Sequence, residues 1–136
     1  MDIGLATTFV STHPRAILAT TRLDGRPQLS PVVAATDDDG RVLISTRETA
    51  VKARNLARDD RATLCVISDS FFGDWVQLDG RAELIHLPAA LPILEYYYRR
   101  ISGEHPDWDA YRAAMRAEKR LIIRITPDRA GPDVSG

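Results

Sequence analysis

An apolar run that ends in two hydroxyl residues and leads into a basic helix is the part of the sequence best suited to hold an anion. The hydroxyls belong to Ser45 and Thr46, and Lys52 and Arg54 follow in a helical pattern. Hydroxyl groups, free amides at a helix start and a nearby cationic side chain are the donors that hold phosphate in proteins. Residues 47–61 carry five basic and three acidic side chains, a local charge of +2. This segment is therefore a candidate phosphate site.

A plainer interpretation explains the same segment as an ordinary capped helix with a solvated basic face. Glu48 supports this interpretation, because a carboxylate near the helix start competes with a bound anion for the same positive end of the helix. On the residues alone the plainer interpretation is favoured, and the phosphate hypothesis needs a second line of support.

Two further segments contain residues that could flank a ligand. In Ser30-Pro31-Val32-Val33 the proline lacks a backbone donor, so it belongs at a sheet edge or a bulge, and bulges re-aim side chains beside sites. Trp75 follows the aromatic loop residues Phe71 and Phe72, and its ring could flank a planar ligand. The plainer interpretations are a protected edge strand and a core tryptophan, and without other information the edge strand is preferred.

The sequence has none of the local motifs of a dedicated catalytic or metal centre. It lacks the glycine-rich phosphate loops, the His-Glu-x-x-His zinc motif and the Gly-x-Ser-x-Gly nucleophile elbow. His13, His86 and His105 are far apart in the chain, and Cys65 lies in a buried-type apolar run. The aspartates of residues 37–39 precede a glycine and are typical of a solvated turn. The sequence therefore predicts neither a dedicated nucleophile nor a bound metal.

Composition and charge exclude several classes of protein. The chain has 136 residues, with 18 lysines and arginines against 19 aspartates and glutamates and a net charge of −1. A general nucleic-acid binder usually has a strong basic excess, and no apolar run approaches the roughly 18 residues that a membrane span requires. One cysteine cannot form an internal disulfide. We expect a cytoplasmic protein that binds neither nucleic acid nor membranes, with one domain over residues 1–127 and a C-terminal tail over residues 128–136.

Glycine and proline divide the chain into short segments with strand or helix patterns. Strands are predicted at residues 16–21, 28–35, 42–46, 62–68, 75–86 and 121–125, and helices at residues 2–12, 48–58, 91–101 and 106–116. Most links between strands are short, which favours antiparallel pairing and a small barrel. Residues 75–86 form either a hairpin that turns at Asp79-Gly80 or one long strand bent at Gly80. The expected fold is mainly β, of the α+β class, with flanking helices.

The candidate segments, in their order along the chain, resemble the pyridoxamine-5′-phosphate-oxidase-like, FMN-binding split β-barrel superfamily over about residues 5–126. The resemblance is carried by Ala19-Thr20, Asp24-Gly25-Arg26-Pro27, Ser30-Pro31-Val32, Ser45-Thr46, Lys52-Ala53-Arg54-Asn55-Leu56, Trp75-Val76 and Gly80-Arg81-Ala82-Glu83-Leu84. Residues 103–112 are similar to actinobacterial members that use the deazaflavin coenzyme F420. The order and spacing of these segments are more specific than any one of them.

The resemblance implies a six-stranded antiparallel split β-barrel of Greek-key type, with one long strand bent at Gly80. It also implies a homodimer with two equivalent cofactor sites shared between the subunits. Residues implied to hold the cofactor phosphate are Ser45, Thr46, Lys52 and Arg54, and Asn55 is implied as a further cofactor contact. Residues implied to line the ring are Leu18, Ala19, Thr20, Ser30, Pro31, Val32 and Val33, with Trp75 and Val76 from the partner chain. Many relatives carry a further basic residue where this chain has Ala50, which leaves a weaker clamp or a substitute in Arg47 or Arg54.

The activity implied by the resemblance is that of an oxidoreductase in which reduced F420 transfers a hydride to a small organic substrate. The alternatives are an FMN-dependent oxidoreductase of the same type and a protein that binds a flavin, deazaflavin or haem-like ligand without turnover. F420 and FMN both carry a phosphate on a ribityl chain, so a phosphate clamp does not discriminate between them. In such enzymes the cofactor supplies the reactive chemistry, which agrees with the lack of other catalytic motifs.

Overall fold

Seven strands and four helices make up the part of the chain that the computed structural model describes, residues 1–132. The strands are β1 (Arg15–Thr21), β2 (Pro27–Val33), β3 (Ala35–Thr36), β4 (Val42–Arg47), β5 (Arg61–Ile67), β6 (Trp75–Ile85) and β7 (Arg120–Gly131). The helices are α1 (Ile3–Thr12), α2 (Val51–Arg58), α3 (Ala90–Ser102) and α4 (Trp108–Ala117). All predicted helices and strands are present, with bounds that shift by a few residues. No helix in residues 1–132 is long and apolar enough to span a membrane.

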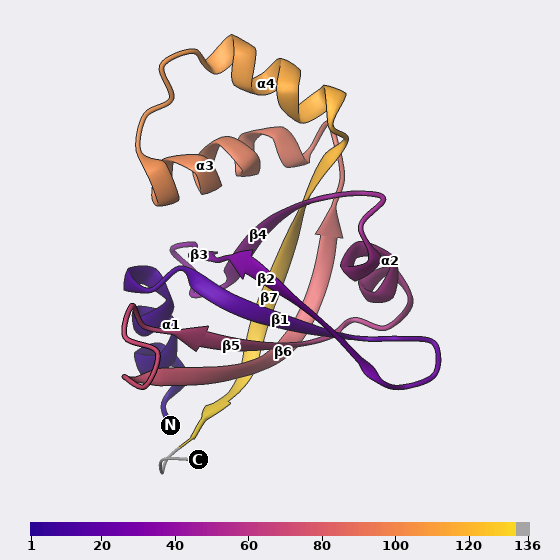
Figure 1. The fold of residues 1–136 in the computed structure, drawn as a ribbon. Coiled ribbons are helices and arrows are strands. Elements are labelled where there is room, and N and C mark those ends of the chain that lie inside the picture. Colours follow the sequence, from indigo (N-terminus) through magenta and orange to yellow (C-terminus); the bar gives the residue numbers. More distant parts are fainter. Residues whose placement is uncertain (133–136) are drawn as a thin grey trace.

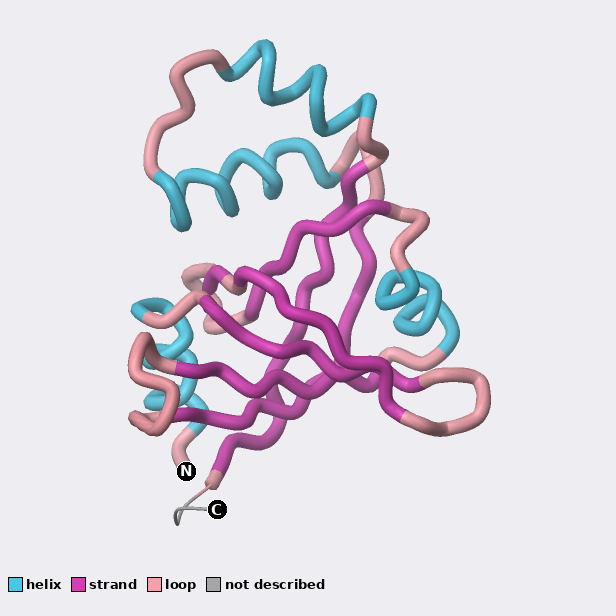
Figure 2. The backbone as a smooth tube through the Cα atoms, in the orientation of Figure 1, coloured by secondary structure: helices cyan, strands magenta, loops and turns pink. Residues whose placement is uncertain are grey.

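The strands form one curled antiparallel sheet in the order β2-β1-β5-β6-β7-β4-β3 (Figures 1 and 2). The prediction of six strands was wrong, because the strand expected at residues 28–35 divides at Ala34. Up to Val33 the chain pairs with β1, whereas Ala35 and Thr36 pair with β4. One continuous stretch of chain therefore supplies both ends of the strand order, and the sheet curls so far that its two edges come together at this junction.

Alternating side chains on β1 and β5 contribute to the core inside the curl. In β1, for example, Ala16, Leu18 and Thr20 are buried, and the residues between them face outward. The same alternation continues across β5, where Leu64 and Val66 are fully buried opposite Leu18 and Ala16. Burial of such apolar side chains is the main favourable contribution to folding, and here it also fixes which side chains of β1 and β2 remain outside for a site.

The long strand β6 settles the ambiguity over residues 75–86. It is a single strand, and its register against β7 shifts between Asp79 and Gly80, as expected for a strand bent at this glycine. A Cβ atom at Gly80 would collide with the Thr126 carbonyl oxygen of β7, so no other residue fits without a shift of backbone. The partner strand β7 runs on to Gly131, beyond the boundary expected at residue 127. Of the expected tail, residues 133–136 lie outside the described part.

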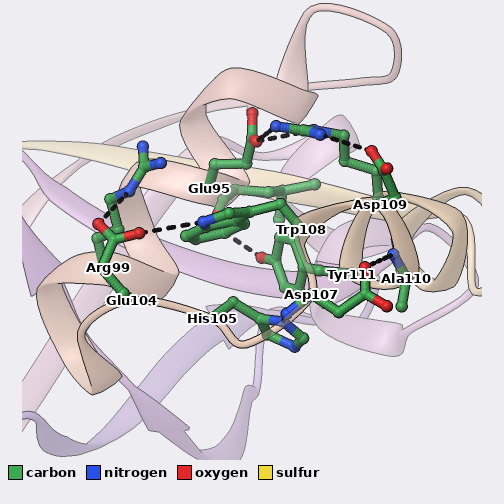
Figure 3. Close-up of polar contacts among 11 residues, drawn as sticks. Glu95, Arg99, Glu104, His105, Asp107, Trp108, Asp109, Ala110 and Tyr111 are labelled. Atoms are coloured by element: carbon green, nitrogen blue, oxygen red, sulfur yellow. Dashed lines mark hydrogen bonds and ion pairs between the residues drawn. The ribbon is translucent and has the colours of Figure 1, made fainter.

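Helices α3 and α4 form a hairpin that packs beyond the ends of β4, β6 and β7 (Figure 1). Its interior is aromatic: Tyr98, His105, Trp108 and Tyr111 contact one another with ring centroids 5.0–5.8 Å apart. The Tyr111 hydroxyl donates a hydrogen bond to the Leu94 carbonyl at 2.8 Å (Figure 3). These contacts join the two helices into one rigid unit that presents α3 to the sheet.

Candidate functional site

A cavity of about 480 Å³ opens where the chain passes from β2 to β3. It is lined by Arg15, Ala16, Ile17, Pro31, Val32, Val33, Ser45, Lys52, Ile67 and Tyr97. Its walls are mostly apolar. Its polar groups are Ser45, Lys52 and Tyr97, from β4, α2 and α3, and Arg15 of β1, which lies 3.9 Å from Asp69. This combination of an apolar cleft with a few placed polar groups is typical of sites for small molecules and cofactors.

Five of the residues predicted from the sequence meet in this cavity. Pro31, Val32 and Val33 come from the end of β2, and Ser45 and Lys52 come from β4 and α2. The predicted ring side and the predicted phosphate side therefore lie in one cavity, although the two segments are separate in the sequence.

Lys52 is the cationic group of this cavity that faces no counter-charge. Its side chain is half-buried, and no hydrogen bond or ion pair joins it to any residue in 1–132. Burial, and secondly the charge of Arg120, lower the pKa of Lys52. A partly buried ammonium group that lacks a partner is destabilised, and a bound anion relieves that cost. The donor set therefore fits a phosphate group.

The start of helix α2 strengthens this fit. The helix begins after Ala50, no side chain caps it, and its first turn holds no acidic residue. Glu48 lies in the turn before the helix and is exposed. The first amides of α2 thus keep their hydrogen-bonding capacity and the positive end of the helix dipole. The sequence suggested that the carboxylate of Glu48 would compete with an anion at the helix start, but this carboxylate neither caps α2 nor lies in its first turn.

The structure distinguishes the two arginines, Arg47 and Arg54, that could substitute for the basic residue missing at Ala50. Arg47 lies 3.7 Å from Glu118, so its charge is partly balanced within the chain. Arg54 is exposed, has no ion pair or hydrogen bond within residues 1–132, and lies on the same helix as Lys52. Arg54 is therefore the freer of the two to approach a ligand, although it does not line the cavity.

Two of the predicted residues hold helix α2 in place. The Asn55 amide donates a hydrogen bond to the Thr20 hydroxyl at 3.1 Å, and both side chains are buried. The Arg58 guanidinium donates to the side-chain amide oxygen of Asn55 at 3.2 Å. Buried polar pairs of this kind are costly unless satisfied, so they specify one arrangement. Thr20 and Asn55 therefore position α2, and with it Lys52, against β1.

The remaining predicted residues lie outside the cavity lining. Leu18, Thr46 and Val76 are buried, and Leu18 and Val76 belong to the hydrophobic core. Ala19 faces outward on β1, and Trp75 is 36% exposed at the start of β6, paired with Ile67 of the cavity wall. These positions stay predictions, and only Trp75 presents a large side chain that a partner or ligand could contact.

Ser30 differs from the other predicted residues because its hydroxyl is buried and has no hydrogen-bond partner within residues 1–132. It lies on β2 opposite Leu18, on the face of the strand that turns away from Pro31. An unpaired buried hydroxyl is rare in folded proteins and usually marks a group that awaits a water or a ligand.

Tyr97 is the main cavity residue that sequence reasoning missed. It comes from α3, is half-buried, and its hydroxyl donates a hydrogen bond to the Val33 carbonyl at 2.8 Å. The helical pattern around Leu94 could have shown that this side of α3 is packed, but not against which strand. Arg15, Ile17 and Ile67 were also missed, and strand alternation next to Pro31 and Trp75 is the signal that could have found them.

A large part of the outer sheet face beside the cavity is apolar and exposed. Leu29 is 60% exposed in the middle of β2, and Val33 and Trp75 lie on the same face. The loop between β5 and β6 carries Phe71 and Phe72, which are 78% and 95% exposed. Exposed apolar side chains gathered on one face are typical of interaction sites.

Residues 5–131 match the model of the pyridoxamine 5′-phosphate oxidase family. Among solved structures, a conserved hypothetical protein of Mycobacterium tuberculosis is 27% identical, with a TM-score of 0.76 over 100% of this chain and 92% of that one. An F420 reductase is 22% identical (TM-score 0.69; 91% of this chain, 94% of that one). The haem storage protein of Vibrio cholerae is 18% identical (TM-score 0.71; 96% and 94%). The F420 reductase and the haem storage protein show the fold alone. The family match covers nearly the whole chain, and this protein therefore belongs to the pyridoxamine 5′-phosphate oxidase family of split β-barrel proteins.

Proposed function

We propose that this protein is an oxidoreductase that uses reduced F420 to transfer a hydride to a small organic substrate. The observation that carries the proposal is the unpaired, half-buried ammonium group of Lys52 beside the uncapped start of α2, in a cavity that is otherwise mostly apolar. A phosphate group fits the ammonium group and the helix start, and a flat tricyclic ring fits the apolar part of the cavity.

Each part of the cavity has a distinct task in this proposal. Lys52, Ser45 and the first amides of α2 bind the phosphate. Ile17, Pro31 and Val33 pack against the ring and exclude water from it. When bound, the deazaflavin supplies the carbon that donates the hydride, so the chain itself needs to bind and orient the reactants.

The preference for F420 over FMN rests on three supports. Residues 103–112 resemble F420-using relatives, an F420 reductase shares the fold, and Arg54 is an exposed cation on the helix of Lys52. F420 carries an acidic oligoglutamyl tail beyond its phosphate, and a cation outside the cavity suits that tail. The alternative is an oxidoreductase of the same fold that uses FMN, and membership of the pyridoxamine 5′-phosphate oxidase family supports a flavin cofactor.

A measurement of hydride transfer distinguishes an enzyme from a protein that only carries the cofactor. Protein loaded with reduced F420 is mixed in a stopped-flow instrument with a quinone, a conjugated enone and a nitroaromatic compound as acceptors. We expect at least one acceptor to oxidise the bound cofactor faster than it oxidises free reduced F420. Equal rates with and without protein for every acceptor would favour the alternative without turnover, which the shared fold of a haem storage protein keeps open.

We further propose that two copies associate through the apolar outer face and share the cofactor sites. The cavity is open toward this face, and Trp75 lies on it next to the cavity residue Ile67. A second copy would cover Leu29 and the Phe71-Phe72 loop, and it would close a cavity that one short chain leaves open.

Leu29→Asp is expected to convert the dimer to a monomer at micromolar concentration. The substitution buries a carboxylate without a partner, which costs at least about 2 kcal/mol and weakens association by roughly 30-fold or more. Leu29 is 60% exposed in one chain, so the fold of the monomer is retained. The control is Leu23→Asp in the β1–β2 turn, where the leucine is 86% exposed and off the sheet. Light scattering that gives the same mass for both variants would contradict this interface.

A further inference from the structure

The junction between β2 and β3 contains a gap in the sheet. Ala35 pairs with Leu43 and Thr36 with Val42, so the same register would bring Val33 opposite Ser45. Val33 instead pairs with Arg15 of β1. The two backbones therefore part at this point, and both residues line the cavity on either side of the gap.

The Tyr97 hydroxyl lies at this gap, in the cavity that Val33 and Ser45 also line. It donates a hydrogen bond to the Val33 carbonyl at 2.8 Å. Burial raises the pKa of Tyr97, and a hydrogen bond from the Ser45 backbone opposes that shift. One phenol group thus takes the place of the direct ladder contact that Val33 and Ser45 would otherwise make.

We propose that Tyr97 is a positioning residue whose hydroxyl holds Val33 and Ser45 at a fixed separation across the gap. The inference rests on the proposed function, in which Val33 contacts the cofactor ring and Ser45 its phosphate. The length between ring and phosphate is set by the ribityl chain, so a fixed spacing of the two walls presents both contacts to the cofactor without rearrangement. Such preorganisation lowers the cost of binding.

Helix α3 is anchored so that it can hold Tyr97 in place. Arg100, on the same helix, donates a hydrogen bond from its guanidinium to the Thr36 carbonyl at 3.2 Å, so α3 is fastened on both sides of the β2–β3 junction. Its other face packs on the rings of Trp108 and Tyr111 in the interior of the hairpin (Figure 3). The hairpin therefore acts as a support for the cavity.

Tyr97→Phe removes the hydroxyl and keeps the ring. The matched control is Tyr111→Phe, which removes a hydroxyl–carbonyl bond of the same 2.8 Å length from the same hairpin, with its acceptor on α3 and not on either side of the gap. In protein without cofactor, hydrogen exchange measured by NMR at the Ser45 amide is expected to be about 3- to 10-fold faster in Tyr97→Phe, the loss expected for one hydrogen bond. Tyr111→Phe leaves that amide at the wild-type rate. Equal exchange in Tyr97→Phe and wild type would overturn the proposal.

Binding of F420 provides the second measurement. We expect Tyr97→Phe to raise the dissociation constant about 3- to 10-fold, and to change the fluorescence of the cofactor at saturation, because its ring is no longer held at one distance from its phosphate. A loss of overall stability alone would not alter the fluorescence at saturation. Wild-type affinity and fluorescence in Tyr97→Phe would overturn the positioning role. If the wild type binds neither F420 nor FMN, the proposed function fails, and the Ser45 exchange still decides whether Tyr97 bridges the gap.

Discussion

Lys52→Met is expected to weaken F420 binding by about 10- to 150-fold, since a hydrogen bond to a charged group contributes about 1.5–3 kcal/mol. Methionine retains most of the length and packing of the lysine stem but lacks its charge. The affinity is measured by quenching of the deazaflavin fluorescence. The loss belongs at the upper end of this range if Lys52 is the main cation at the phosphate, because its ammonium group has no other partner in residues 1–132.

The control for this variant is Arg116→Met, which removes one positive charge from an exposed position in the last turn of α4. A general effect of net charge would weaken binding equally in both variants, and an equal loss would remove the phosphate role of Lys52. The pH dependence adds a second check. Only the ammonium form attracts phosphate, so wild-type affinity falls as the pH rises through the lowered pKa of Lys52, earlier than for an exposed lysine. Lys52→Met lacks this dependence.

Gly80→Ala is expected to lower the free energy of unfolding by about 3 kcal/mol, the upper part of the usual range for overpacking. The added Cβ would collide with the backbone of Thr126 and approach the Ile125 side chain, and backbone atoms of a central strand cannot move aside as a flexible side chain can. Urea unfolding followed by circular dichroism measures the change, with an unchanged m-value as evidence of the same transition.

Gly131→Ala is the matched control, because this glycine lies in the same pair of strands and a Cβ there meets no atom within 4 Å. We expect it to change stability by less than about 0.5 kcal/mol. Similar losses in both variants would show that the bend at Gly80 is not what requires glycine.

Local patterns in the sequence predicted most of the fold. The alternation of β1 and β5 and the helical repeat of α3 are properties of neighbouring residues, so the positions of these elements were correct. The division of residues 28–35 at Ala34 could not be predicted in this way. Val32, Val33, Ala34 and Ala35 form one apolar run with no turn residue to mark a break, and the partner strand changes within it, from β1 to β4. Such a change depends on how far the whole sheet curls.

The residues that line the cavity were also predicted only in part from the sequence. Residues of one segment, such as Ser45 and Lys52, carry their own signal in hydroxyls followed by a basic helix. Tyr97 carries none, because its contact with Val33 spans 64 positions of sequence and depends on how the α3–α4 hairpin docks. The pairing of Arg47 with Glu118, which lies at the turn before β7, was hidden for the same reason.

The buried pair of Thr20 and Asn55 shows a different limit. Both residues were predicted as cofactor contacts from the family resemblance, and the structure shows a hydrogen bond that fastens α2 to β1. A family motif records that a residue type recurs at a position. Contact of Thr20 and Asn55 with a cofactor stays a prediction, and their hydrogen bond shows a structural role that the resemblance did not indicate.

The most direct test of the proposed function is a side-by-side titration of the purified wild-type protein with F420 and with FMN, followed by fluorescence under the same conditions. We expect F420 to bind in the micromolar range or tighter, the order of about −8 kcal/mol, and at least tenfold more tightly than FMN, with one F420 per chain. Tighter binding of FMN would establish the flavin alternative, and binding of neither would contradict the assignment of the cavity at the β2–β3 junction as a cofactor site.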